Sequence, residues 1–265
     1  MAKEKKAKKK KKKNKGSGFG VLSVIIIVLL GILFLGIGFL GGYVIPGIFF
    51  GDDEEKTVVV TEEAAYPLPR SDYELIVNRS NPLEAEFIGG SGELVDLEGF
   101  DDVQLETETA AALTKMIADM KFEGLDITVY AGYVSAEDQE SLYEKETRNQ
   151  GGDELKAAVT VGLPLTDENQ TGLAVDLTVD GTLSSSFDYS PAGKWLKEHC
   201  ADYGFILRYT NSGKKVTGVE SQPWHFRYVG SPETAKLIMH SGKSMEEYYG
   251  TFLNPEDLDP YLPYL

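Results

Sequence analysis

The sequence predicts an α+β domain, with helices first and a mostly antiparallel sheet after them. Apolar residues recur at helical spacing between residues 104 and 122, which predicts an amphipathic helix. Branched apolar residues fill the 173–179 segment, which predicts a buried strand. Two further segments, 205–209 and 224–229, have the composition of strands. Helices followed by strands indicate an α+β fold, in which helices flank the sheet.

The other elements are expected in a simple order along the chain. They are a strand and turn at 75–83, a strand at 125–130, a helix at 136–147, a glycine- and proline-containing loop at 148–167, closing helices at 232–240 and 245–249, and an irregular tail at 251–265. One more helix has clear boundaries. Pro191 suits a first helical turn, Ser190 before it suits the cap, and Gly204 suits the end.

The N-terminus is predicted to be a membrane anchor. Ten lysines lie among the first fifteen residues, and residues 16–51 carry no charge. The apolar run 19–40 has 22 residues, enough to cross a hydrocarbon core of about 30 Å as a helix. We therefore divide the chain into a lysine-rich cytoplasmic tail (1–18), a transmembrane anchor (19–43), an acidic, proline-containing stalk (44–72), an extracytoplasmic domain (73–250) and a C-terminal tail (251–265).

Charge sets the expected orientation and limits the partners. Lysines on the N-terminal flank and acidic residues on the other place the N-terminus in the cytoplasm, which predicts a single-pass cell-membrane protein. A nucleic-acid-binding tail is the alternative for the lysine tract. Residues 16–265 hold 16 basic and 41 acidic residues, a net charge of about −25. Such a surface argues against a nucleic-acid partner. Cys200 is the sole cysteine, so no intramolecular disulfide can form, and we expect its side chain to be buried.

Two motifs carry the chemistry. Residues 167–176 read DENQTGLAVD and residues 222–228 read QPWHFRY. Together they resemble the VanY-type D-alanyl-D-alanine carboxypeptidases and dipeptidases of bacterial cell-wall metabolism, the LAS group of zinc peptidases. The pattern of that family is Ser-x-His-x-x-Gly-x-Ala-x-Asp followed by Glu-Pro-Trp-His. The resemblance covers roughly residues 75–249, and it implies a VanY-type fold, zinc as the family cofactor and a peptidoglycan stem peptide as the ligand.

The resemblance assigns three zinc ligands to Asn169, Asp176 and His225. A catalytic zinc site takes three protein ligands and leaves one position for water. Asn169 stands where the family has histidine, and an amide oxygen is a weaker donor for zinc than imidazole. We therefore expect no zinc or weakly bound zinc. The other histidines, His199 and His240, fall in predicted helices away from the motifs.

The resemblance also implies that catalytic groups are missing. Gln222 stands where the family has the glutamate that moves protons, and an amide cannot do so near neutral pH. Val134 stands where the family has an arginine that grips the terminal carboxylate of the substrate. Ser135 and Gln139 match the spacing of the family's serine and glutamine, and we place them in the substrate cleft. Trp224 is either a cleft wall or a core residue.

Three functional hypotheses follow. The first is a catalytically inactive VanY-like domain that binds a stem peptide or a cell-envelope protein, or has a regulatory role there. The second is an active metallo-D,D-carboxypeptidase with a rearranged site that uses the carboxylate of Asp167, Glu168 or Glu220. Of these, Asp167 stands where the family motif has serine. Converging carboxylates would then suit calcium better than zinc. The third is a scaffold that uses its outer surface and its anchor only.

Overall fold

A four-stranded antiparallel sheet organises the domain, in the order β3-β4-β6-β5. Its strands are β3 (Thr128–Ala131), β4 (Ala174–Thr178), β5 (Phe205–Tyr209) and β6 (Gln222–Tyr228). A separate two-stranded sheet pairs β1 (Leu94–Asp96) with β2 (Gln104–Glu106). The computed structural model describes residues 66–69, 71–84 and 87–265, which belong to one compact unit that begins at Tyr66.

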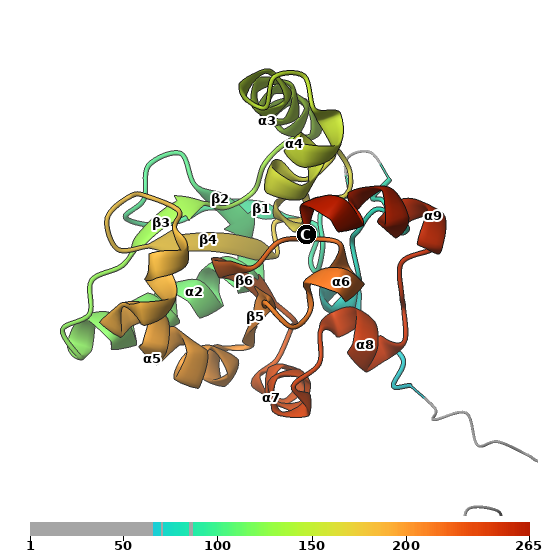
Figure 1. The fold of residues 1–265 in the computed structure, drawn as a ribbon. Helices are drawn as coiled ribbons and strands as arrows, with labels where there is room; N and C mark the ends of the chain where they lie inside the picture. The colour runs from blue at the N-terminus through green and yellow to red at the C-terminus, as the bar shows by residue number, and fades with distance from the viewer. Residues whose placement is uncertain (1–65, 70, 85–86) are drawn as a thin grey trace, which may run out of the picture. The chain divides into compact units, whose positions relative to one another are not determined.

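Helices surround the sheet (Figure 1). They are α2 (Thr107–Phe122), α3 (Ala136–Asn149), α4 (Glu154–Val161), α5 (Pro191–His199), α6 (Lys214–Thr217), α7 (Pro232–Ser241), α8 (Met245–Tyr249) and α9 (Pro255–Leu258). Short 3-10 helices are η1 (Asp72–Glu74), η2 (Glu168–Thr171), η3 (Ser185–Tyr189), η4 (Cys200–Tyr203) and η5 (Asp259–Tyr264). The α+β class with antiparallel strands is therefore confirmed.

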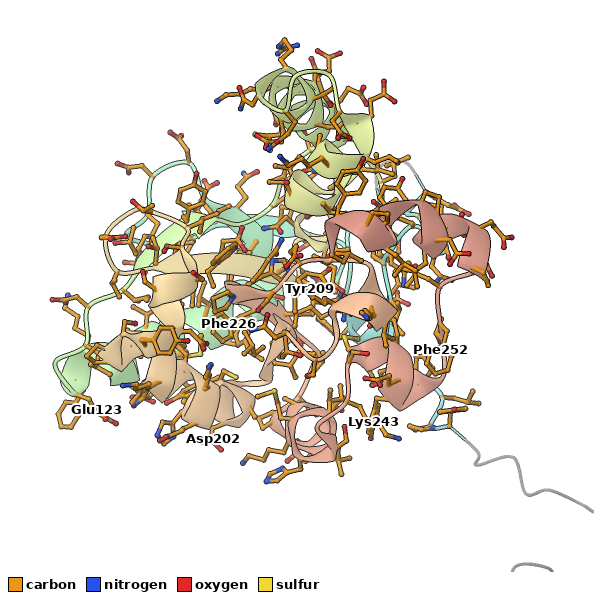
Figure 2. All side chains as sticks on the ribbon, viewed as in Figure 1. Glu123, Asp202, Tyr209, Phe226, Lys243 and Phe252 are labelled. Carbon is orange, nitrogen blue, oxygen red and sulfur yellow. The ribbon has the colours of Figure 1, made fainter. Side chains whose placement is uncertain are left out.

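The two faces of the sheet differ in chemistry because strand side chains alternate between faces. One face packs on the main hydrophobic core, to which α2 contributes Leu113, Met116 and Met120. Phe226 of β6 lies in that core, inside the domain (Figure 2). Its neighbours His225 and Arg227 are also buried but make polar contacts on the other face. The candidate site lies on this polar face.

Most predicted elements of the C-terminal half are confirmed. Strand β5 and helix α8 have the expected bounds, and α7 ends one residue later than expected. Ser190 caps α5 by accepting a hydrogen bond from the Gly193 N–H at 2.9 Å. Gly204, with φ 83°, ends the following 3-10 turn in the left-handed conformation that glycine adopts readily. His199 ends α5 and His240 lies in α7, as expected. Cys200 is buried, and burial raises the pKa of its thiol to about 12.

Four local predictions are wrong. The expected loop 148–167 contains α4, because Asp153 caps a helix rich in alanine and the flanking glycines mark only its ends. In the 75–83 segment the expected turn forms at residues 78–81, but an isolated bridge between Asn78 and Asn81 stands in place of the expected strand. The first three residues of the expected helix 104–122 form β2. The tail 251–265 contains α9 and η5, where prolines occupy first helical turns.

The predicted anchor and most of the stalk lie outside the described residues. Among the described residues, no helix is both long and apolar enough to cross a bilayer.

Candidate functional site

The pairing of β4 with β6 brings two predicted metal ligands together. Asp176 and His225 are direct partners across the two antiparallel strands. His225 Nδ1 lies 2.9 Å from Asp176 Oδ1, and the two atoms form a hydrogen bond. His225 is 2 % exposed, so this contact is shielded from water. The structure thus brings together two of the three residues that the family resemblance assigned as metal ligands.

Asn169, at the third ligand position, has a structural role in this fold. It lies in η2, where the Asp167 side chain accepts a hydrogen bond from its backbone N–H at 2.9 Å. The Asn169 side-chain nitrogen donates to the Gly132 carbonyl at 3.0 Å, and the Val134 N–H donates to the Asn169 carbonyl at 3.2 Å. Asn169 therefore ties the metal-ligand segment to the loop that carries Val134.

Glu168 is the centre of a buried ionic network that the motif comparison did not identify. Its Oε1 accepts hydrogen bonds from Arg208 Nε at 2.9 Å and from Arg227 Nη1 at 2.8 Å. Arg208 also forms a bidentate pair with Glu246 of α8, at 2.8 and 2.6 Å. The side chains of Glu168 and Arg208 are fully buried. Arginines inside two buried strands were the available signal, because a buried charge requires a partner.

Charges in this network set the protonation of His225. Burial alone would lower the pKa of the imidazole, but the contacts with Asp176 and Glu168 outweigh it and raise the pKa to about 9. His225 Nε2 lies 3.5 Å from Glu168 Oε2, within ion-pair range, and neither atom has a hydrogen-bond partner. Burial would raise the pKa of Glu168, yet Arg208 and Arg227 hold it well below its usual range. The imidazole of His225 thus lies between the carboxylates of Asp176 and Glu168.

The residues present do not fit a three-ligand zinc site. His225 Nδ1 and Asp176 Oδ1 converge as two competent donors, but the third corner has only the amide of Asn169, whose nitrogen is bound to Gly132. Across the described part of the chain, no group of three or more His, Cys, Asp and Glu side chains is placed to hold a metal ion.

The carboxylates considered for a rearranged site have other partners. Glu168 is neutralised by two arginines, as described above. Asp167 caps η2, and burial raises the pKa of its carboxyl to about 6. Glu220 precedes β6 and lies 3.4 Å from Lys214 Nζ in a partly exposed pair. These contacts do not favour a rearranged metal site built from the side chains of Glu168, Asp167 and Glu220.

Gln222 begins β6 and lines a small cavity together with Asp167 and Tyr209. The cavity has a volume of about 20 Å³, room for about one water molecule. Burial and the nearby Glu168 raise the pKa of the Tyr209 hydroxyl well above its usual value. The amide of Gln222 can hold a water molecule here, but it cannot accept its proton.

None of the four other predicted site residues lines this cavity. Val134 borders an open hollow next to α3. Ser135 caps α3 by accepting a hydrogen bond from the Asp138 N–H at 3.1 Å. Gln139 is buried, and its amide nitrogen donates to the Val161 carbonyl at the end of α4 at 2.5 Å. Trp224 is half-buried against the main core, on the face of β6 opposite His225. Their roles in a substrate cleft stay predictions.

Comparison with known proteins decides the family. The family model described as "VanY: D-alanyl-D-alanine carboxypeptidase" matches residues 102–231. A D-alanyl-D-alanine carboxypeptidase of Enterococcus faecalis is 31% identical over 207 residues, which cover 75% of this chain and 72% of that protein. The chain belongs to the VanY family. A Bacillus subtilis relative, YodJ, is 35% identical over 148 residues, which cover 55% of this chain, and the chain spans about half of that protein's length, 53%.

Solved VanY structures share this fold. VanYB in complex with D-alanine-D-alanine is 30% identical, with a TM-score of 0.59, and the match covers 68% of this chain and 98% of that one. A vancomycin-resistance D,D-pentapeptidase VanY variant in complex with Zn(II) is also 30% identical, with a TM-score of 0.58, and the match covers 66% and 98%. Zinc is thus the cofactor of the VanY family, and VanY proteins bind D-Ala-D-Ala.

Proposed function

We propose that this protein is a VanY-family domain that binds a peptide ending in D-Ala-D-Ala without hydrolysing it. One observation carries the proposal. Asp176 and His225 converge as two competent metal ligands, but the third position holds Asn169, whose side-chain nitrogen donates to the Gly132 carbonyl. Gln222 in the place of the proton-transfer glutamate supports the same conclusion, because general acid-base catalysis contributes about 10²–10⁴-fold to the rate.

The ligand class is inferred from the family. A VanY protein binds D-Ala-D-Ala, and this chain keeps the VanY fold over most of its length. We propose a peptidoglycan stem peptide as the ligand, with a cell-envelope protein as the alternative partner. We further propose that the predicted 19–43 anchor holds the domain on the outer side of the cell membrane, as a sensor or regulator. The predicted anchor and the charge pattern of the sequence support this placement.

A metal and activity assay tests the loss of catalysis. The purified chain, dialysed against zinc, should hold well below one zinc per molecule by atomic absorption. It should release no D-alanine from diacetyl-L-Lys-D-Ala-D-Ala. Release that depends on zinc would reject the proposal in favour of an active carboxypeptidase. Glu220→Gln in that case would show whether this carboxylate replaces the missing acid.

A restoring variant serves as the matched control. The triple substitution Asn169→His, Gln222→Glu and Val134→Arg returns the ligand, the proton-transfer group and the carboxylate clamp that the family pattern has. We expect about one zinc per molecule and D-alanine release at least about 10²-fold above the unmodified chain. A folded triple variant that still binds no zinc would show that the assigned ligand geometry is wrong.

A further inference from the structure

The C-terminal segment, residues 254–264, covers one wall of the cavity that Gln222 lines. It consists of α9 and η5, and η5 packs against α4. Figure 1 shows the segment alongside α4, with the end of the chain between α4 and α6. Residues of both neighbours, Ala158 of α4 and Thr217 of α6, line the cavity. The segment therefore packs behind residues that line the cavity, although none of its own residues lines it.

Arg79 joins this segment to the cavity. Arg79 is one of the residues that line the cavity, and its guanidinium donates hydrogen bonds to the Gly218 carbonyl at 2.5 Å and to the Ala158 carbonyl at 2.9 Å. The guanidinium carbon lies 3.9 Å from the centre of the Tyr261 ring in η5, a cation-π contact. Tyr261 thus covers a face of Arg79 that a ligand would otherwise reach.

Arg79 has no acidic partner in the described part of the chain. None of the ion pairs there includes it, and its Nε is buried without a hydrogen-bond partner. This is unusual in a domain with so many carboxylates, and burial lowers the pKa of the guanidinium from its ordinary value. A guanidinium that lacks a carboxylate is suited to binding one, because its planar N–H groups match the geometry of a carboxylate.

The C-terminal segment is held by few contacts. No residue of α9 or η5 is buried. Asp257 accepts a hydrogen bond from Ser80 Oγ at 2.7 Å, and the same hydroxyl accepts one from the Asn254 N–H at 2.8 Å. Leu253, just before the segment, is buried and remains attached to the domain. Regions with so few apolar contacts open locally at a small fraction of the global stability.

We propose that the C-terminal segment is a displaceable lid, and that Arg79 binds the carboxylate of the incoming ligand once Tyr261 moves away. The inference rests on the proposed function and deepens it. With the lid closed, the cavity of about 20 Å³ has no room for a peptide. Val134, which borders a different hollow, leaves the family's carboxylate clamp empty, and Arg79 offers a guanidinium beside the cavity that Gln222 lines. The observed affinity is then the intrinsic affinity reduced by the fraction of molecules whose lid is open.

Binding measurements on the full chain test this inference. The probe is diacetyl-L-Lys-D-Ala-D-Ala, the acid, and its binding is titrated by calorimetry. The control ligand is the same peptide with a C-terminal amide, which lacks the carboxylate. Tyr261→Ala should bind the acid at least about threefold more tightly than the unmodified chain, because it removes the contact that holds the lid. Tyr189→Ala, at an exposed tyrosine of η3, is the control and should change nothing.

Substitutions of Arg79 test the carboxylate contact. In the Tyr261→Ala background, Arg79→Gln should weaken binding of the acid at least about tenfold and leave the weak binding of the amide unchanged. Arg79→Lys keeps the charge, and its affinity for the acid should lie between those of the Tyr261→Ala background and of Arg79→Gln. Because Arg79 donates to two backbone carbonyls, Arg79→Gln can fail to fold, and Arg79→Lys then tests the carboxylate contact. Hydrogen exchange of residues 255–264 should speed up in Tyr261→Ala.

The outcomes separate this inference from the proposed function. If the acid binds every variant equally, or the amide binds as tightly as the acid, the lid and the role of Arg79 are wrong while the proposed function stands. If no variant binds the peptide, both are overturned. If the unmodified chain hydrolyses the peptide, but the Arg79 and Tyr261 substitutions change its affinity as predicted, only the proposed loss of catalysis is wrong.

Discussion

At the scale of single residues, Glu168 connects the candidate site to the framework of the domain. Its carboxylate neutralises Arg208 and Arg227, and it lies one residue before Asn169. Arg227 also donates to the carbonyls of Tyr73 and Leu75, so the network reaches the first residues of the domain. This arrangement ties the walls of the candidate site to the framework of the domain.

Glu168→Gln should therefore be strongly destabilising. Removing one partner of a buried ion pair leaves uncompensated charge, and the free energy of unfolding should fall by about 3–5 kcal/mol. Urea unfolding at pH 7, followed by circular dichroism, measures this change. Glu144→Gln is the matched control, since Glu144 pairs with Arg148 on the exposed face of α3 and should be neutral. A loss for Glu168→Gln no larger than for Glu144→Gln would contradict the assigned role.

At the scale of elements, short helices position the buried charges. Helix α8 has five residues but carries Glu246, which pairs with Arg208, and Tyr249, whose hydroxyl donates to Glu74 at 2.5 Å. A capping box begins this helix. The Ser244 side chain accepts from the Glu247 N–H at 3.3 Å, and Glu247 accepts from the Ser244 N–H at 3.0 Å.

Ser244→Ala should lower the free energy of unfolding by about 1 kcal/mol, because it removes the side-chain acceptor at the helix start. Ser244→Thr keeps a hydroxyl and should stay close to the unmodified protein. Urea unfolding of both variants, together with hydrogen exchange at the Glu247 amide, tests the cap. Equal stability of the alanine and threonine variants would show that the box contributes nothing.

Elements also show where prediction from sequence succeeds. Strand β5 and helix α8 were predicted correctly because their patterns are local, a buried apolar run and a capped amphipathic turn. Helix α4 was missed because its flanking glycines, Gly151 and Gly152, made the whole segment look like a loop. The strand expected at 75–83 did not form because Asn78 and Asn81 pair with each other in a tight turn.

At the scale of the whole molecule, the pH dependence of stability reflects carboxylates that join distant segments. Glu106 accepts hydrogen bonds from Tyr73, Ser91 and Thr109, which come from three parts of the chain. Burial would raise the pKa of Glu106, but the Ser91 hydroxyl and the backbone N–H groups outweigh burial and lower it from 4.5. The lowered pKa means that Glu106 stabilises the fold above about pH 4.5, and that this contribution is lost as the pH falls.

Glu106→Gln should accordingly flatten the acid side of the stability profile. At pH 7 the variant should be less stable by about 1–3 kcal/mol, the cost of hydrogen bonds that a buried carboxylate would otherwise accept. Below pH 4.5 the difference should shrink, because the unmodified protein then takes up a proton on Glu106 in unfolding. Urea unfolding at several pH values measures the stability difference at pH 7 and below pH 4.5. Glu98→Gln, at an exposed glutamate, is the control. A difference that stays constant with pH would refute the assignment.

The sequence by itself determined the fold class and the VanY motifs, and it predicts that the metal, proton-transfer and clamp positions lack the side chains of the family pattern. Those conclusions depend on residue identity and local spacing, which the sequence states directly. Only the tertiary structure decided that Asn169 is bound to Gly132, that Glu168 is neutralised by Arg208 and Arg227, and that Tyr261 covers Arg79. The contacts of Asn169 and Glu168 join residues 37 to 59 positions apart in the sequence, and Tyr261 and Arg79 lie near opposite ends of the domain sequence. Only folding brings such side chains together.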